Sequence, residues 1–387
     1  MTVRHDHGVV RGLALLMMLG GAAPMLPPGP LSTRGNQIID SQDHSVRILS
    51  IGAFSDVSDK IALIAGAGFN TIRLDWGNRS LKSDNKLAEL DRVVLAAGQL
   101  HMRVILDDHS NESAEGTLWK PCFAQQVNGL WYDLGGASDG TDGCDDPGTV
   151  TDEQFVKDWE VVATHYRYND TVIGYDIWNE PLEYGKSTWE PGNRNPTHNI
   201  RYMYERVGNA ILAIDPSKLI ICEGPLTGAS LADRRWPAPW GDLSIAGRYP
   251  VNLLVPNKLV YSVHDYPTEI GGFSPDSGPT KVDLMNKTWG YLVSRNIAPV
   301  WIGEMGGDML TEGDKNWART MIDYANGNLG GAGGPVFGPQ EQGIGIDWWY
   351  AGYDPNGKPT GIFGENNTLN ERVRAAYRQF FTYHSVE

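Results

Sequence analysis

Residues 171–180 read TVIGYDIWNE, an apolar run that ends abruptly in polar residues. The run hardly alternates between apolar and polar positions, which is typical of a strand buried on both faces of a parallel sheet. Similar runs occur at residues 46–52, 69–76, 102–109, 218–224, 258–266, 298–304 and 343–350. Eight buried strands of this kind indicate a parallel sheet covered on both faces.

Helix-forming segments separate the strand runs. Capping residues predict three helix starts: Thr151 with Gln154, Asn195 with Pro196, and Thr368 with Glu371. The fifth run is followed only by a weak helical segment at about residues 226–233. Alternating strands and helices predict an α/β fold, a single (β/α)8 TIM barrel over residues 31–387. A doubly wound nucleotide-binding sheet is disfavoured because no GxGxxG follows the first strand.

The composition excludes several classes of protein. With 41% hydrophobic and 20% charged residues, 46 Gly and 23 Pro, the 387-residue chain is too apolar for a disordered protein and too rich in turn residues for a coiled coil. A net charge of −15 opposes binding to nucleic acid. The 13 Trp and 16 Tyr supply rings that can stack on sugars, although core packing uses such rings equally well.

The N-terminus has the layout of a secretory signal. Arg4 and Arg11 precede an apolar stretch at residues 12–23, and a Pro-rich spacer follows at residues 24–30. The apolar stretch is too short to span a bilayer. We therefore expect residues 1–30 to be a signal peptide and spacer, with the cleavage site open, and the mature protein to be secreted or periplasmic without a membrane anchor.

The three cysteines predict one disulfide. Cys122 and Cys144 flank a stretch dense in Gly and Asp, which in an exported protein favours a disulfide that closes a long loop. Cys222 lies inside an apolar strand run and is expected to be a buried free thiol. The spacing lacks the paired character of a zinc site, so we expect no metal and no cofactor.

Polar residues gather where the strand runs end, and a barrel of this kind carries its reactive groups there. These residues are Arg73, Asp108, His109, Asn179, Glu180, His264, Tyr266, Glu304, Trp348 and Trp349. Glu180 and Glu304 follow their runs directly. Paired carboxylates across a barrel mouth suit glycoside hydrolysis, in which one group donates a proton and the other stays ionised. Taken singly, each Glu could equally be bonded to amides of the barrel rim.

Two short segments carry a family resemblance. Residues 176–181 read DIWNEP and residues 302–306 read IGEMG, and these resemble the acid/base and nucleophile signatures of glycoside hydrolase family 5, retaining (β/α)8 enzymes dominated by cellulases. The segments around Arg73 and His109 fit the same family. Residues 246–267 and 286–304 are similar to its secreted bacterial endo-β-1,4-glucanases. The resemblance extends over about residues 33–363.

The resemblance implies a role for each matching residue. Glu180 would be the acid/base and Glu304 the nucleophile of a retaining endo-β-1,4-glucanase. Arg73 and Tyr266 would hydrogen-bond the nucleophile, and Asn179 would reach the sugar 2-hydroxyl. His109 and His264 would line the subsite of the reacting sugar, either by direct contact or as donors to its other residues. The two carboxyl groups would stand about 5 to 5.5 Å apart.

Aromatic residues are harder to assign. Trp348 and Trp349 compete for the place of a stacking Trp, with Trp349 favoured, and one alignment puts Ala351 there. Trp240 and Trp236 would be platforms for sugars on the other side of the cut, or would pack within their loop. The first strand run is followed by Phe54, where relatives have an aromatic-rich loop, so Phe54 would take over that role or a sugar subsite is weakened.

Several alternatives stay open. Within the family, activity on mannan or mixed-linkage glucan, or exo action, would use the same machinery. A metal-dependent barrel hydrolase would take its ligands from Asp107, Asp108, His109, His264 and Asp265. A catalytically inactive sugar-binding barrel is disfavoured because both carboxylates are present. We expect a monomer acting on a β-glucan polysaccharide or oligosaccharide.

Overall fold

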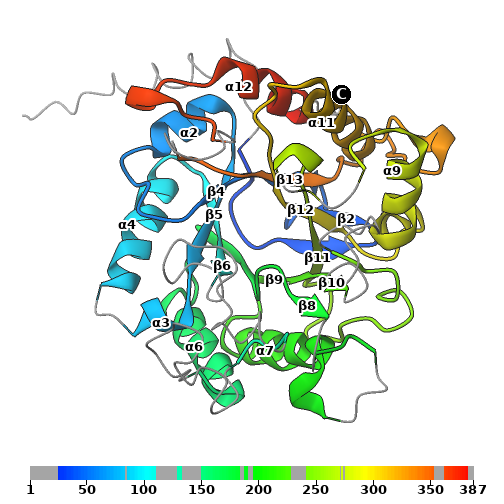
Figure 1. The fold of residues 1–387 in the computed structure, drawn as a ribbon. Helices are drawn as coiled ribbons and strands as arrows, with labels where there is room; N and C mark the ends of the chain where they lie inside the picture. The colour runs from blue at the N-terminus through cyan, green and yellow to red at the C-terminus, as the bar shows by residue number, and fades with distance from the viewer. Residues whose placement is uncertain are drawn as a thin grey trace, which may run out of the picture.

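The computed structural model describes residues 25–82, 85–109, 129–132, 150–183, 187–190, 195–227, 241–270, 272, 275–352 and 361–381. Eight parallel strands form a closed barrel at the centre of the molecule (Figure 1). They are β4 (Leu49–Ala53), β5 (Thr71–Trp76), β6 (Arg103–Asp108), β7 (Val172–Asp176), β9 (Leu219–Glu223), β11 (Leu259–Asp265), β12 (Val300–Met305) and β13 (Gly345–Trp348). Each overlaps one predicted run, so the predicted (β/α)8 barrel is confirmed.

Helices surround the barrel in Figure 1. The α-helices are α2 (Ile61–Ala67), α3 (Asn78–Leu81), α4 (Lys86–Gln99), α6 (Asp152–His165), α7 (Ile200–Ile214), α9 (Gly278–Met285), α10 (Tyr291–Ser294), α11 (Glu312–Ala325) and α12 (Glu371–Tyr377). Short helical turns are η2 (Pro196–His198), η3 (Thr268–Ile270), η4 (Asn286–Gly290), η5 (Gly330–Ala332), η6 (Glu365–Asn367) and η7 (Arg378–Phe381). The helices cover the outside of the strands, which explains why the strands are apolar on both faces.

The predicted helix starts have mixed outcomes. The Thr151 side chain accepts from the Gln154 N–H and caps α6 as predicted. Asn195 caps only the short turn η2, and α7 begins after Asn199, whose side chain accepts from the Tyr202 N–H. Helix α12 is capped by Asn370 and not by Thr368.

Backbone pairing explains both corrections. Thr188 forms an isolated parallel bridge with Asn199, and Phe363 forms an antiparallel bridge with Leu369. Each bridge holds the chain extended just before the helix, so the helix starts later than the capping pattern predicts. The predicted helical segment at residues 226–233 is also wrong at its start, because Leu226–Thr227 form strand β10 beside β8 (Leu182–Glu183); residues 228–233 lie outside the described residues.

The N-terminal hairpin closes the bottom of the barrel. Strands β1 (Ser32–Arg34), β2 (Gln37–Ile39) and β3 (Ser45–Val46) form a small antiparallel sheet. Leu31 and Ile38 from this region pack in one buried cluster with Ile105, Ile173 and other residues from the N-terminal halves of the barrel strands. The carboxyl ends of the strands are therefore the end of the barrel that is left for a site.

Cys222 on β9 is fully buried and carries no disulfide within the described part of the chain, as predicted. Cys122 and Cys144 lie outside the described residues, as does most of the predicted signal segment. Among the residues that the structure describes, no helix is both long and apolar enough to cross a membrane.

A buried arginine joins the first barrel strand to the last. Arg47 precedes β4 and donates to the carbonyl oxygen of Ile344 at 2.9 Å and to Asn326 Oδ1 at 2.8 Å. Because Arg47→Met leaves these buried acceptors without their donor, it should lower the free energy of unfolding by about 1 to 3 kcal/mol. Denaturant unfolding measures this loss.

The control is Arg34→Met, which removes an exposed ion pair with Asp43 at 3.6 Å. An exposed pair contributes about 0 to 1 kcal/mol, so this variant should unfold close to the wild type. Equal losses in the two variants would contradict the role given to Arg47 in barrel closure.

Candidate active site

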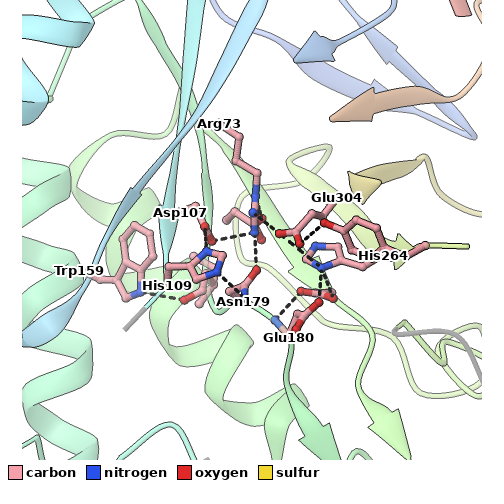
Figure 2. Close-up of polar contacts among 12 residues, drawn as sticks. Arg73, Asp107, His109, Trp159, Asn179, Glu180, His264 and Glu304 are labelled. Atoms are coloured by element: carbon pink, nitrogen blue, oxygen red, sulfur yellow. Dashed lines mark hydrogen bonds and ion pairs between the residues drawn. The ribbon is translucent and has the colours of Figure 1, made fainter. Parts of the chain in front are cut away.

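Arg73 lies at the centre of the polar cluster in the barrel mouth (Figure 2). Its side chain comes from β5 and is fully buried. The guanidinium contacts Asp176 Oδ2 at 3.0 Å, Glu304 Oε2 at 3.1 Å, Asn179 Oδ1 at 2.8 Å and Asp107 Oδ1 at 3.0 Å. Burial alone would lower the pKa of Arg73, but attraction to Asp107, Asp176 and Glu304 raises it well above its ordinary value. Arg73 is thus a permanent buried cation.

Glu304, in β12, receives two hydrogen bonds from protein groups. Arg73 donates to one carboxylate oxygen at 3.1 Å, and the Tyr266 hydroxyl donates to the other at 2.5 Å. Burial, and then the nearby Glu304, raise the pKa of Tyr266 well above its ordinary value, so the hydroxyl keeps its proton. Donors on both oxygens favour the ionised carboxylate. An ionised, oriented carboxylate has the properties of a nucleophile.

Glu180 follows β7 and is held in an unusual conformation. Its φ of 45° lies in the left-handed region, which a residue with a side chain adopts only where surrounding contacts fix it. Its backbone N–H donates to Glu223 Oε2 at 2.7 Å, and its carboxyl oxygen lies 3.2 Å from His264 Nδ1. One oxygen of Glu180, one of Glu304 and a ring nitrogen of His264 all lie within 4.8 Å of one another. The two carboxyl groups therefore face the same small space.

His264 is fully buried among three carboxyl groups. Its Nδ1 atom lies 3.2 Å from Glu180, 3.3 Å from Glu223 and 3.9 Å from Glu304. Burial, followed by repulsion from Arg73 and His109, lowers the pKa of His264 well below 6.5. The imidazole is therefore neutral at neutral pH and adds no positive charge beside Glu180.

The remaining buried carboxyl groups do not all carry a charge. Burial raises the pKa of Asp176 to about 7, with Arg73 acting in the opposite direction. Burial also raises the pKa values of Glu223 and Asp347 well above their ordinary range. Burial therefore favours the protonated forms of Glu223 and Asp347, which limits the negative charge packed around Arg73.

An aromatic group borders the carboxylates. Trp349 stacks on His109 with ring centroids 5.7 Å apart and an interplanar angle of 13°, and Phe54 meets the Trp349 ring edge-on at 4.1 Å. Gly52 makes this packing possible, because a Cβ atom there would lie 2.1 Å from the Trp349 ring. Phe54 is 41% exposed, so the group offers aromatic surface at the mouth.

The structure distinguishes between Trp348 and Trp349 as the candidate for stacking on a sugar. Trp348 has no exposed surface and packs beside Trp317 and Tyr377. A side chain without accessible surface cannot stack on a sugar, so the prediction for Trp348 is wrong. Trp349 is partly exposed and stays the candidate, whereas Ala351 is buried. Trp236 and Trp240 lie outside the described residues.

The structure does not bring together all the residues that the metal-dependent alternative would use as ligands. Asp265 contacts Lys281 Nζ at 2.6 Å and the Trp317 indole nitrogen at 2.7 Å, so it faces α9 and α11. Asp107 is bound to Arg73 and to His109 Nδ1. Within the described ranges, one group of side chains has the spacing to hold a cation, and it consists of Glu180, His264 and Glu304.

Sequence reasoning missed two residues of this cluster. Glu223 ends β9, which is the same signal that identified Glu180 and Glu304, whereas Asp347 lies inside β13 and gives no strand-end signal. The sequence analysis names Asp176 only as the first residue of the DIWNEP motif, and Asp107 only as a ligand in the metal-dependent alternative. All four face the cluster around Arg73, and each carboxyl group contributes to the electrostatics there.

A closed parallel barrel with two facing carboxyl groups and an aromatic border at its mouth has the architecture of a glycoside hydrolase. Residues 36–354 match the family described as Cellulase (glycosyl hydrolase family 5). The chain belongs to this family and is a glycoside hydrolase.

Named relatives agree with the family. The chain is 28% identical over 338 residues to an endoglucanase of Paenibacillus polymyxa, covering 78% of this chain and 77% of the relative. It is 25% identical over 327 residues to the major extracellular endoglucanase of Xanthomonas campestris pv. campestris, covering 74% of this chain and 60% of that protein. An endocellulase structure from Pyrococcus horikoshii aligns with a TM-score of 0.68 at 24% identity, over 93% of this chain and all of that one. This last likeness concerns the fold.

The raised pKa of Asp347 predicts a pH-dependent stability. A buried acid whose folded-state pKa exceeds its unfolded value stabilises fully below the unfolded pKa, and that stability is lost as pH rises towards the folded pKa. Asn cannot titrate. The stability of Asp347→Asn relative to the wild type should therefore be higher at pH 7 than at pH 5, by up to about 1.4 kcal/mol for each pH unit. Denaturant unfolding at both pH values measures the difference.

The control is Leu254→Ala. Leu254 is 85% exposed and its side chain does not titrate, so the difference between this variant and the wild type should change little with pH. A pH-independent difference for Asp347→Asn would show that Asp347 is ionised in the folded protein.

Proposed function

We propose that this chain is a retaining endo-β-1,4-glucanase in which Glu304 is the nucleophile and Glu180 the acid/base. The observation that carries the proposal is the contrast between the two carboxyl groups. Glu304 accepts hydrogen bonds from Arg73 and Tyr266, whereas Glu180 lies beside the neutral His264. Two carboxyl groups in different electrostatic surroundings divide the roles of base and acid.

The first step breaks the glycosidic bond. The ionised Glu304 attacks the anomeric carbon and forms a glycosyl ester, while protonated Glu180 gives its proton to the departing sugar oxygen. Arg73 and Tyr266 keep Glu304 oriented, and Asn179, itself held by Arg73 at 2.8 Å, presents its amide towards the 2-hydroxyl. His109 accepts from this amide at 3.0 Å, which fixes the amide orientation.

The second step releases the sugar. The ionised Glu180 takes a proton from water, the water oxygen bonds to the anomeric carbon, and the ester bond to Glu304 breaks. The short distance between the Glu180 and Glu304 carboxyl groups supports this two-step retaining mechanism over an inverting one. Oxygens of the two carboxyl groups lie within 4.8 Å, whereas an inverting pair is about 6.5 to 9.5 Å apart to admit a water between them.

The substrate is proposed to be a β-1,4-glucan. The relatives are named endoglucanases, and structures of the Pyrococcus horikoshii endocellulase were solved with cellotetraose. Trp349 and the exposed Phe54 provide the aromatic surface on which a glucose ring would stack. A reducing-sugar assay on carboxymethylcellulose, lichenan, mannan and xylan distinguishes the glucanase from a mannanase or a mixed-linkage enzyme.

We also propose that the protein is exported. The supporting features are the signal-like residues 1–30 and the relative from Xanthomonas campestris, which is named extracellular. A disulfide between Cys122 and Cys144 and a monomeric state belong to the same proposal. Mass mapping of the non-reduced secreted protein tests the disulfide and the cleavage site together.

Replacing either carboxylate should nearly abolish hydrolysis of cellulose oligosaccharides. Glu180→Gln removes the proton donor and should lower kcat by about 10²- to 10⁴-fold. Glu304→Gln should lose more, because no glycosyl ester can form. Thermal unfolding checks that both variants fold, and the exposed Glu190→Gln serves as the control with wild-type kcat.

Azide separates the two roles. With an activated aryl cellobioside, azide should restore turnover in Glu180→Ala by attacking the glycosyl ester, and the product should be the β-glycosyl azide. In Glu304→Ala, azide should replace the nucleophile and yield the α-glycosyl azide. The opposite assignment of the two products would reverse the roles of Glu180 and Glu304.

A further inference from the structure

Glu223 contacts the proposed proton donor, but neither step of the mechanism uses it. It ends β9, its side chain is fully buried, and its Oε2 atom accepts from the Glu180 backbone N–H at 2.7 Å. The Tyr204 hydroxyl from α7 donates to the Glu223 backbone oxygen at 2.9 Å, which fixes the end of the strand from the outer side. Glu223 is therefore a rigidly placed acceptor.

The bond to Glu180 takes the place of a missing sheet contact. Strand β7 pairs with β9 only as far as Asp176 with Ile221, after which the chain leaves the ladder. Four residues later, Glu180 sits at a φ of 45° with its N–H buried in the mouth. A buried N–H needs an acceptor, and the Glu223 carboxyl group provides it. This contact is one that can hold Glu180 in its left-handed conformation.

The second oxygen of Glu223 faces the histidine that touches the Glu180 carboxyl group. Glu223 Oε1 lies 3.3 Å from His264 Nδ1, and the same nitrogen lies 3.2 Å from Glu180 Oε1. Glu223 Oε1 and His264 Nε2 have no hydrogen-bond partner among the described residues. Glu223 therefore touches Glu180 by two routes, directly at the backbone and through His264 at the side chain.

We propose that Glu223 is a positioning residue for the proton donor: one of its oxygens holds the Glu180 backbone, and the other packs against His264, which contacts the Glu180 carboxyl group. The inference rests on the proposed acid/base role of Glu180. It assigns to Glu223 no contact with the sugar and no proton transfer.

The charge around Glu223 fits a neutral carboxyl group. Asp176 and Glu180 face it from the β7 side, Glu304 from β12, His264 from β11 and Arg73 from β5. Burial, and then repulsion from Asp176, raise its pKa well above the ordinary value. A neutral acid can accept with its carbonyl oxygen and offer its proton from the other oxygen. In its protonated form, Glu223 also adds no negative charge beside Glu180.

The leaving group provides the test. Cellotetraose needs a proton from Glu180, whereas 2,4-dinitrophenyl β-cellobioside with added azide needs neither the acid nor the base. Glu223→Ala should lower kcat on cellotetraose by about 10²-fold, with little change in KM, because the donor is no longer held in place. On the aryl substrate with azide, the same variant should lose no more than a few-fold. Glu223→Gln keeps the acceptor oxygen without a charge and should recover most of the lost activity.

The control is Ile220→Ala on the same strand, whose side chain is buried and lies beside Gly208 of α7. Any loss there should affect both substrates alike. Should Glu223→Ala not fold, Glu223→Asp withdraws the carboxyl group by one methylene and should show the same split between substrates.

Equal losses of Glu223→Ala on both substrates, full activity on cellotetraose, or a Gln variant as impaired as the Ala variant would each overturn the inference. Failure of the proposed function looks different, because the wild type would then not hydrolyse cellotetraose, or azide would give the opposite products from Glu180→Ala and Glu304→Ala.

Discussion

The buried guanidinium of Arg73 is the interaction on which the site depends. A cation without exposed surface must be paired, since an unpaired buried charge costs several kcal/mol. Arg73 meets this requirement with groups from three other strands or their ends: Asp107, Asp176 and Asn179, and Glu304. The ion pairs that offset the free-energy cost of burying Arg73 also fix the orientation of Glu304, the proposed nucleophile. Fold stability and catalytic geometry are therefore linked through one side chain.

Burial then gives the two proposed catalytic carboxyl groups different electrostatic surroundings. The cluster holds more carboxyl groups than Arg73 can neutralise, and burial raises the pKa values of Glu223 and Asp347, which favours their protonated forms. Glu304 lies beside the permanent cation, whereas Glu180 lies beside a neutral imidazole. The donors around Glu304 favour its ionised form. The neutral surroundings of Glu180 allow it to hold a proton, donate it and take it back. The chemistry follows from which neighbours carry charge.

The sequence predicts the fold well because parallel strands buried on both faces are uniformly apolar, and that signal is local. The positions of Glu180 and Glu304 near the ends of their strands were predictable for the same reason, whereas Arg73 lies in the middle of β5 and not at its predicted end. Other features depend on contacts between distant segments. Whether Trp348 or Trp349 faces the mouth depends on how β13 pairs with β4, where Trp348 lies opposite Ile51. The start of α7 depends on the bridge of Thr188 to Asn199. In the sequence, Glu223 is one of several acidic residues at a strand end. Its contact with the Glu180 N–H depends on the left-handed conformation of Glu180, which the sequence does not indicate.

The stereochemistry of hydrolysis tests whether Glu304 acts as the nucleophile. If Glu304 attacks the anomeric carbon and water then replaces it, two inversions leave the configuration unchanged. Proton NMR of a cello-oligosaccharide digest, recorded before mutarotation, should show the β-anomer of the new reducing end appearing first. An α-anomer appearing first would mean that water attacks directly, and it would contradict the account of Glu304 held as a nucleophile by Arg73 and Tyr266.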